Sequence, residues 1–250
     1  MTDRVTAAKD RLAKITARIS ELEGWSRFTA DQLLTFMQPL AQKRVSTRSQ
    51  SGSNLSYVEA HDIKNMLIRM FGFGGFSSVA THSEVKTGEW FVNAKSGKDN
   101  VKVLAIATVE ITIHPPRRPG LMTDFPEVKY AETAVSSQTG ADEGDTADFA
   151  MKTAESDAFK RAAIFLGTQF GLSLYAKGAT EDQVIVLFDP VQKELLTLAG
   201  ERARIHAFLA SASAPTGASV TSEPAPSTTP DANTAQGAST ASLQGAFNGG

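Results

Sequence analysis

Residues 146–175 read TADFAMKTAESDAFKRAAIFLGTQFGLSLY, and this stretch decides the fold. Its helix-forming residues predict one long amphipathic helix, with Thr146 as the N-cap and Asp148 in the first turn, where a negative charge suits the helix dipole. Gly171 is the predicted C-terminal stop. The apolar residues recur at helical spacing, so they predict one face that packs on a core. That face consists of Phe149, Ala150, Ala154, Ala158, Ala162, Phe165 and Leu166.

A basic stripe follows another side of this helix. Lys152, Ser156 and Lys160 recur at steps of four, and Arg161 lies about 100° further round. We expect the stripe to point away from the core. A Lys-Arg pair on a helix is more often a solvated face than a binding site, so the surrounding sequence has to decide its role.

Composition indicates a folded, soluble protein. The chain has 250 residues, of which 41% are hydrophobic, enough to bury the core of one or two domains. The absence of cysteine excludes disulfides and thiolate metal sites and fits a reducing compartment. No apolar run reaches the length of a membrane span, and the first residues lack the apolar run of a signal peptide. We therefore expect a cytoplasmic protein with no membrane partner.

Charge argues against a uniformly basic surface. No Lys or Arg follows Arg204, whereas Glu223 and Asp231 do, so residues 1–204 carry all 25 basic side chains and 27 − 2 = 25 acidic ones. A nucleic-acid-binding domain usually carries excess positive charge. Any nucleic-acid site in this chain must therefore be a local groove.

Three helices are predicted before residue 72. Residues 3–23 carry a heptad pattern, which predicts a short coiled coil or, more in keeping with three heptads, a helix docked on a neighbour. Thr29 and Gln32 form a capping box for a second helix, and Ser56 with Glu59 forms one for a third that ends at Gly72. Between them, residues 43–56 predict a short strand and a flexible turn. The heptad positions are Val5, Ala8, Leu12, Ile15, Ile19 and Leu22.

From about Ser78 to Ala134 the pattern alternates with period two, which predicts an antiparallel sheet. The central strand lies at residues 101–113, with flanking strands near 78–86 and 127–135. We expect the loop that carries Arg117 and Arg118 to leave both side chains solvated. One face of the central strand holds Val101, Val103, Ala105, Ala107, Val109, Ile111 and Ile113.

After the long helix, residues 180–188 end in an apolar run, and a helix is predicted from Asp189-Pro190 to about Leu209. The remainder is rich in Ala, Ser, Thr, Gly and Pro and predicts disorder. Leu243 and Phe247 could form a short docking motif, although a featureless tail fits the composition better. We expect four parts: an N-terminal heptad helix at 1–27, a core at 28–178, a helical extension at 179–209 and a disordered tail at 210–250.

The sequence shows no catalytic centre. Its glycine-rich segments, 72–75 and 96–98, lack the spacing of a phosphate loop. The four histidines are far apart, and the acidic connector at 138–145, which leads into the long helix, would hold Mg²⁺ only nonspecifically. We therefore predict a protein that is not an enzyme, with no metal site and no cofactor.

What remains is a pattern of cations and aromatic rings suited to binding nucleic acid. Cations neutralise phosphates, and nucleobases stack on rings. The candidate residues are Arg48, Tyr57, Phe71, Lys152, Lys160 and Arg161.

Several motifs of residues 28–175 together resemble the Rad-fifty-two family of single-strand annealing proteins, including its phage and bacterial members. They are Phe28-Thr-Ala-Asp31, Arg48, Tyr57-Val-Glu-Ala-His61, Met70-Phe-Gly-Phe-Gly-Gly-Phe76, Phe159-Lys-Arg-Ala162 and Phe170-Gly171. The combination of YVEAHDIKNMLIRMFGFGGF with DAFKRA is specific, whereas each piece alone is weak.

The resemblance implies an α+β fold in which a curved antiparallel sheet is backed by the long helix, and a ring of commonly about eleven subunits. It also implies a basic groove around the ring that binds single-stranded DNA, and annealing of complementary strands without ATP. By position, Arg48, Lys152, Lys160 and Arg161 would hold phosphates, and Tyr57 and Phe71 would shape the groove.

The sequence departs from the family pattern at three places. Ile164 and Phe149 stand where basic residues are expected, and the connector at 142–145 is acidic where eukaryotic members are basic. The inner groove is therefore thinner, and a second, outer DNA site rests only on Lys98 and Lys102.

Three alternatives stay open. The chain could be a mediator that coats single strands or loads a recombinase, a metal-dependent nucleic-acid enzyme, or a purely structural ring. The expected partners are single-stranded DNA and further copies of the chain. A single-strand binding protein or a recombinase is a candidate partner of the C-terminal tail. A phage or bacterial source is expected.

Overall fold

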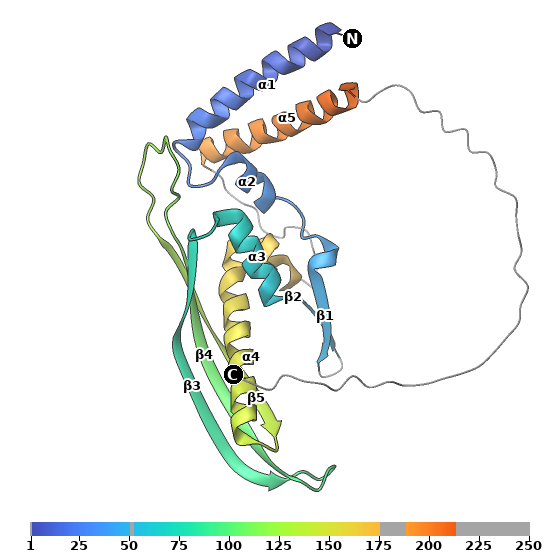
Figure 1. The fold of residues 1–250 in the computed structure, drawn as a ribbon, viewed down its shortest axis with the longest axis vertical. Coiled ribbons are helices and arrows are strands. Elements are labelled where there is room, and N and C mark those ends of the chain that lie inside the picture. The colour runs from blue at the N-terminus through green and yellow to red at the C-terminus, as the bar shows by residue number, and fades with distance from the viewer. Residues whose placement is uncertain (1, 51–52, 176–188, 214–250) are drawn as a thin grey trace, which may run out of the picture. The chain divides into compact units, whose positions relative to one another are not determined.

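A computed structural model describes residues 2–50, 53–175 and 189–213 (Figure 1). The predicted α+β class, with antiparallel strands and a long helix, is confirmed. The predicted apolar run at 180–188, and the predicted tail from residue 214 on with its Leu243–Phe247 motif, lie outside the described residues. The helices are α1 (Thr2–Glu23), α2 (Ala30–Phe36), α3 (Ala60–Phe71), α4 (Glu143–Ala163) and α5 (Pro190–Ser213), and the strands are β1 (Val45–Gln50), β2 (Ser53–Val58), β3 (Phe76–Val92), β4 (Asp99–Ile113) and β5 (Val128–Gly140).

The main sheet has the order β3-β4-β5, with both pairs antiparallel. The predicted central strand is β4, and its neighbours are longer than the sequence pattern indicated. Figure 1 shows these long strands bending along their length, with α4 lying against them. The predicted inward face of β4 is confirmed, because all seven of its residues are at most 4% exposed.

Alanines let α4 lie close to the sheet. Ala150, Ala154, Ala158 and Ala162 are all 0% exposed and follow one another at steps of four, so they form a single seam along the helix. The first two pack with Val101 to Ala107 of β4, and the last two with Val109 to Ile113. At the tight connection into the helix, a Cβ on Gly140 would meet Thr146 Oγ1 at 2.2 Å.

The ends of α4 differ from the prediction. The helix begins at Glu143 and is capped by Asp142, whose carboxylate accepts a 2.8 Å bond from the Asp145 amide. Thr146, the predicted N-cap, is buried in the first turn, and the acidic connector shrinks to residues 141–142. The helix ends at Ala163 instead of continuing to Gly171.

Three short 3₁₀ turns follow α4: Ile164–Leu166, Thr168–Phe170 and Leu172–Tyr175. Gly167 between the first two has φ of 102°, which a helix cannot contain and a side chain would resist. Phe149 and Phe165, which were predicted on the packed face, are 59% and 54% exposed. Phe165 instead stacks on Tyr130 of β5, with ring centroids 5.5 Å apart.

A two-stranded hairpin precedes α3. β1 and β2 pair antiparallel, with Arg48 opposite Leu55. The second strand was missed: Ser56 lies in it and caps no helix, so the predicted capping box at Ser56–Glu59 is wrong. Glu59 is the N-cap residue of α3 but makes no side-chain cap bond. The capping box of α2 is confirmed, with Thr29 and Gln32 bonded reciprocally.

The N-terminal helix docks on another helix, as its heptads favoured, and that helix, α5, belongs to the same chain. Ile15, Ile19 and Leu22 are buried against Leu195 and Ala199 of α5, together with residues of α2. Exposed ion pairs flank this contact, Arg11–Glu201 at 2.7 Å and Arg18–Glu194 at 2.8 Å. Helix α5 starts at Pro190 as predicted and continues to Ser213, so residues 210–213 are helical.

Arg118, expected in solvent, is half-buried and holds the end of α1. Its guanidinium donates to the carbonyls of Glu23, Ser26 and Arg27. A cation there suits the negative end of the helix dipole. Arg117 is exposed, as predicted.

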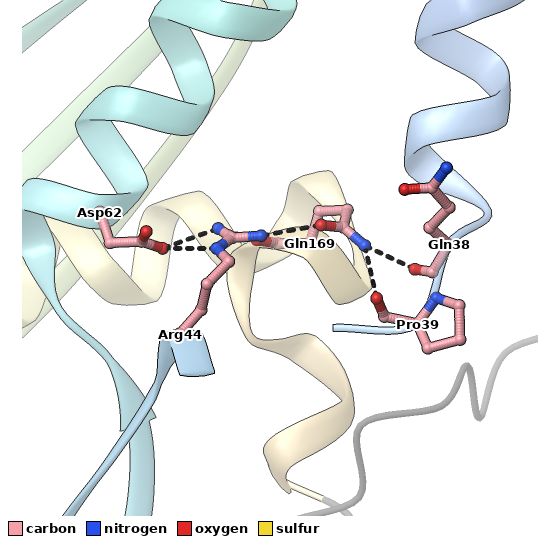
Figure 2. Close-up of polar contacts among 5 residues, drawn as sticks. All are labelled: Gln38, Pro39, Arg44, Asp62 and Gln169. Carbon is pink, nitrogen blue, oxygen red and sulfur yellow. Dashed lines mark hydrogen bonds and ion pairs between the residues drawn. The ribbon is translucent and has the colours of Figure 1, made fainter. Parts of the chain in front are cut away.

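One polar network fixes the hairpin to the rest of the fold (Figure 2). Arg44, just before β1, donates to Asp62 of α3 at 2.8 Å and to both the side chain and the carbonyl of Gln169, at 2.8 and 2.9 Å. Gln169 donates in turn to the carbonyls of Gln38 and Pro39, at 2.5 and 3.2 Å. Gln169 is only 5% exposed, so each of its polar atoms needs these partners.

We expect Ala154→Leu to destabilise the fold by about 3 kcal/mol, because the added atoms must separate α4 from β4. Urea unfolding followed by circular dichroism measures the change. Ala203→Leu, at an exposed position of α5, is the matched control and should change the free energy of unfolding by less than about 0.5 kcal/mol. Equal stability of the two variants would contradict close packing at the seam.

We expect Arg44→Ala to lower the free energy of unfolding by roughly 2–4 kcal/mol, because it leaves Asp62 and the buried Gln169 without their donor. The same unfolding experiment measures it. Arg11→Ala breaks an exposed pair and should cost less than about 1 kcal/mol. A loss for Arg44→Ala as small as that of the control would show that the network does not hold the hairpin.

Candidate nucleic-acid interface

A groove of about 830 Å³ lies between the hairpin, α4 and the 3₁₀ turns. It contains four of the six predicted binding residues, Arg48, Tyr57, Lys160 and Arg161. They come from segments more than a hundred positions apart in the sequence. The other lining residues are Asn54, Leu55, Ser56, Val58, Ile63, Val135, Asp157, Ile164, Phe170, Gly171, Leu174 and Tyr175.

Two cations of this groove lie close to the ring of Tyr57. The Arg48 guanidinium carbon lies 5.6 Å from the centroid of its ring, and Lys160 Nζ lies 5.2 Å from the same centroid. Both distances are within the range of a cation–π contact. The Tyr57 hydroxyl donates a 2.9 Å bond to Glu59, and this bond is the main reason that the pKa of Tyr57 is raised. The phenol is neutral at physiological pH, as an unperturbed tyrosine also is, and two positive charges lie near its ring.

The two basic residues of α4 have different partners. Lys160 Nζ pairs with Asp157 at 2.5 Å, and the exposed fractions of the two side chains are only 19% and 26%. Arg161 is exposed and donates a 3.2 Å bond to the carbonyl of Thr133 on β5. Arg161 thus keeps most of its donors available, whereas Lys160 is already engaged by a carboxylate.

Lys152 and Phe71 do not line this groove. Lys152 lies two turns before Lys160 on α4, is 72% exposed and pairs with Asp148 at 2.5 Å. Phe71, at the end of α3, lines a separate hollow of about 230 Å³ together with Arg27, Phe73 and Arg117. Phe71 also packs at the edge of the main hydrophobic core, and the centroid of its ring lies 6.4 Å from that of Phe36.

Lys98 and Lys102, the predicted second site, are exposed; Lys98 directly precedes β4, and Lys102 lies near its start. Ile164 does line the groove, so an apolar side chain occupies the place where a basic one was expected. Within the part of the chain that the structure describes, the groove therefore holds three cations, Arg48, Lys160 and Arg161.

Sequence reasoning missed two groove residues that matter chemically. Asp157 stands three positions before Lys160, a spacing that places them on neighbouring turns, so this pair was available to sequence analysis. Tyr175 is 71% exposed at the groove and offers a second ring. Its position depends on the 3₁₀ turns after α4, which the helical pattern did not indicate. Leu55 and Val135, 43% and 57% exposed, add apolar surface.

The parts of the chain that the structure describes contain neither a cluster of metal-binding side chains nor a membrane-spanning helix. Within residues 2–50, 53–175 and 189–213, no three His, Asp or Glu side chains gather as a metal site would require. None of the helices in the same ranges is long and apolar enough to cross a membrane.

The groove and the fold agree with a comparison against protein families. The model of the Rad52/22 family of double-strand break repair proteins matches residues 29–186, which is more than half of the chain and includes every residue named above as lining the groove. The chain therefore belongs to the Rad52/22 family of double-strand break repair proteins.

Proposed function

We propose that this protein binds single-stranded DNA in the groove between the hairpin and α4, and that it anneals complementary strands without ATP. The observation that carries the proposal is the gathering of Arg48, Tyr57, Lys160 and Arg161 in one groove of a double-strand break repair protein. A single strand carries a line of phosphates, which cations bind, and flat bases, which stack on aromatic rings, and the groove offers both kinds of group.

The groove would hold the backbone more than the bases. Its three cations are side chains that neutralise phosphates, and phosphate contacts carry no sequence information. The exposed apolar atoms of Leu55 and Val135 would contact sugars. A strand held by its backbone leaves base edges free to pair with a second strand, which is the requirement for annealing.

We further propose that subunits assemble side by side into a ring, of about eleven by family resemblance. β3 is an outer strand of the sheet, with β4 on one side only among the described strands. It exposes Val85, Trp90 and Val92 by 43%, 52% and 64%, a large apolar surface for a strand edge. β5 is the opposite edge, so contact of β3 with a neighbour's β5 would be head-to-tail and could close a ring.

A ring would also explain how a chain with a net charge near zero can bind DNA. Three cations per subunit are few for a nucleic-acid-binding protein, but repetition around a ring makes a continuous basic track.

Lys160→Ala combined with Arg161→Ala should weaken binding of a fluorescent oligo-dT at least tenfold and slow the annealing of complementary oligonucleotides in parallel. The loss of Arg161 should also reduce the slope of log K against log salt by about 0.7 for each subunit in contact, the value for one phosphate of a single strand, and Lys160, which is paired with Asp157, should add less than that. Fluorescence anisotropy and a strand-annealing assay without ATP measure these effects.

The control for this experiment is Lys9→Ala with Lys14→Ala, which removes two exposed cations of α1. It should leave both readouts unchanged. Unaltered DNA binding in the groove variant would contradict the assignment. Binding without any acceleration of annealing by the wild type would favour a mediator that coats strands.

Trp90→Glu with Val92→Glu should convert the assembly into smaller species, because two charges would have to be buried at the contact. Size-exclusion chromatography with light scattering measures the mass, and circular dichroism checks that the subunit still folds. Met122→Glu, at a 63% exposed apolar residue outside β3, is the control. An intact assembly in the β3 variant would show that the subunits meet elsewhere.

A further inference from the structure

The groove contains a carboxylate as well as its cations. Asp157 lines it and forms the 2.5 Å pair with Lys160. Another lysine pair of the same length on α4, Lys152 with Asp148, lies in solvent, with exposed fractions of 72% and 60%. The corresponding fractions for Lys160 and Asp157 are 19% and 26%, so water screens this pair much less.

The surroundings of Lys160 make Asp157 its nearest anion. Among the described residues, the charged side chains that line the groove are Arg48 from β1 and Asp157, Lys160 and Arg161 from α4. Glu59, between β2 and α3, is engaged by the Tyr57 hydroxyl. A phosphate that approaches Lys160 therefore has to replace Asp157 and come to rest beside its negative charge.

This exchange has a consequence for how long DNA stays bound. Lys160 and Asp157 together carry no net charge, so at this position a phosphate gains little neutralisation and releases few counterions. When the phosphate leaves, Asp157 is one helical turn away and can pair with Lys160 at once. The groove then loses one contact at a much smaller cost than if Lys160 were left unpaired.

We propose that Asp157 is an internal competitor for the phosphate site on Lys160 and that it sets the lifetime of the bound single strand. The inference rests on the proposed function, because it assigns a role within the same groove. A short lifetime suits annealing, since two strands must shift against one another until their sequences match.

The test is Asp157→Asn in the full chain. Removal of the carboxylate should slow the dissociation of a fluorescent oligo-dT about five- to tenfold and tighten equilibrium binding by a similar factor. The slope of log K against log salt should become steeper by about 0.7 per subunit in contact, because Lys160 then neutralises its phosphate fully. Stopped-flow competition measures dissociation, and anisotropy between low and high salt measures the slope.

Two further variants separate charge from structure. Asp157→Glu keeps a carboxylate and should restore fast dissociation, whereas Asp157→Ser, which removes it in a smaller side chain, should behave like Asp157→Asn. Asp31→Asn makes the same chemical change on α2, where Asp31 pairs with Arg202 and does not line the groove, and it controls for net charge. Light scattering and thermal unfolding check that each variant assembles and folds as the wild type does.

The outcomes are distinct. The inference is overturned if the oligo-dT dissociates from the Asp157→Asn variant as fast as from the wild type, or faster. That result would show that Asp157 positions Lys160 for the phosphate. Slower dissociation with an unchanged salt slope would also overturn it, because competition between anions must alter the slope. A wild-type protein that binds no single-stranded DNA would instead contradict the proposed function.

Discussion

The close contact between α4 and β4 is the constraint on which the rest of the structure depends. Alanines at every fourth position bring the helix against the sheet, and a larger side chain at any of them would meet β4. This contact also sets the rotation of the helix. Lys160 follows the buried Ala158 by two positions, about 200° round, so it is turned away from the sheet and toward the hairpin. The same packing that builds the core therefore places the basic residues.

The groove has α4 on one side and the β1–β2 hairpin on the other. The hairpin is held by hydrogen bonds and an ion pair, whereas α4 is held by apolar packing. The hairpin is held through Arg44, whose partners lie on α3 and on the turn after α4. Because Gln169 also holds the chain before β1, the two walls are connected through one buried side chain (Figure 2). The distances of 5.6 and 5.2 Å from the Tyr57 ring to Arg48 and Lys160 follow from these two anchors, one apolar and one polar.

Sequence reasoning succeeded where a pattern has one physical reading. The alternation along β4 and the capping box at Thr29 each predicted what the structure shows. It failed where one pattern fits two structures: Ser and Glu three apart suit a helix start, yet Ser56 lies in a strand. The end of α4 depends on the positive φ of Gly167, which composition does not reveal. For the groove, helical spacing already put Lys160 and Arg161 side by side, whereas placing Phe71 outside it and Tyr175 inside it required the positions of separate turns in space.

A groove with few phosphate contacts is consistent with tight DNA binding when many subunits bind the same strand. In the proposed ring each subunit contributes a few phosphate contacts, and every added contact is made within an already bound complex, so the total affinity grows steeply with the number of subunits. A small weakening at each subunit then has little effect on whether DNA is held, but a large effect on how easily a local segment detaches. In the proposed competition, a carboxylate placed beside one lysine in every groove would act on that local step. Strand retention and strand movement can therefore be set separately, the first by the number of subunits and the second by the charges within each.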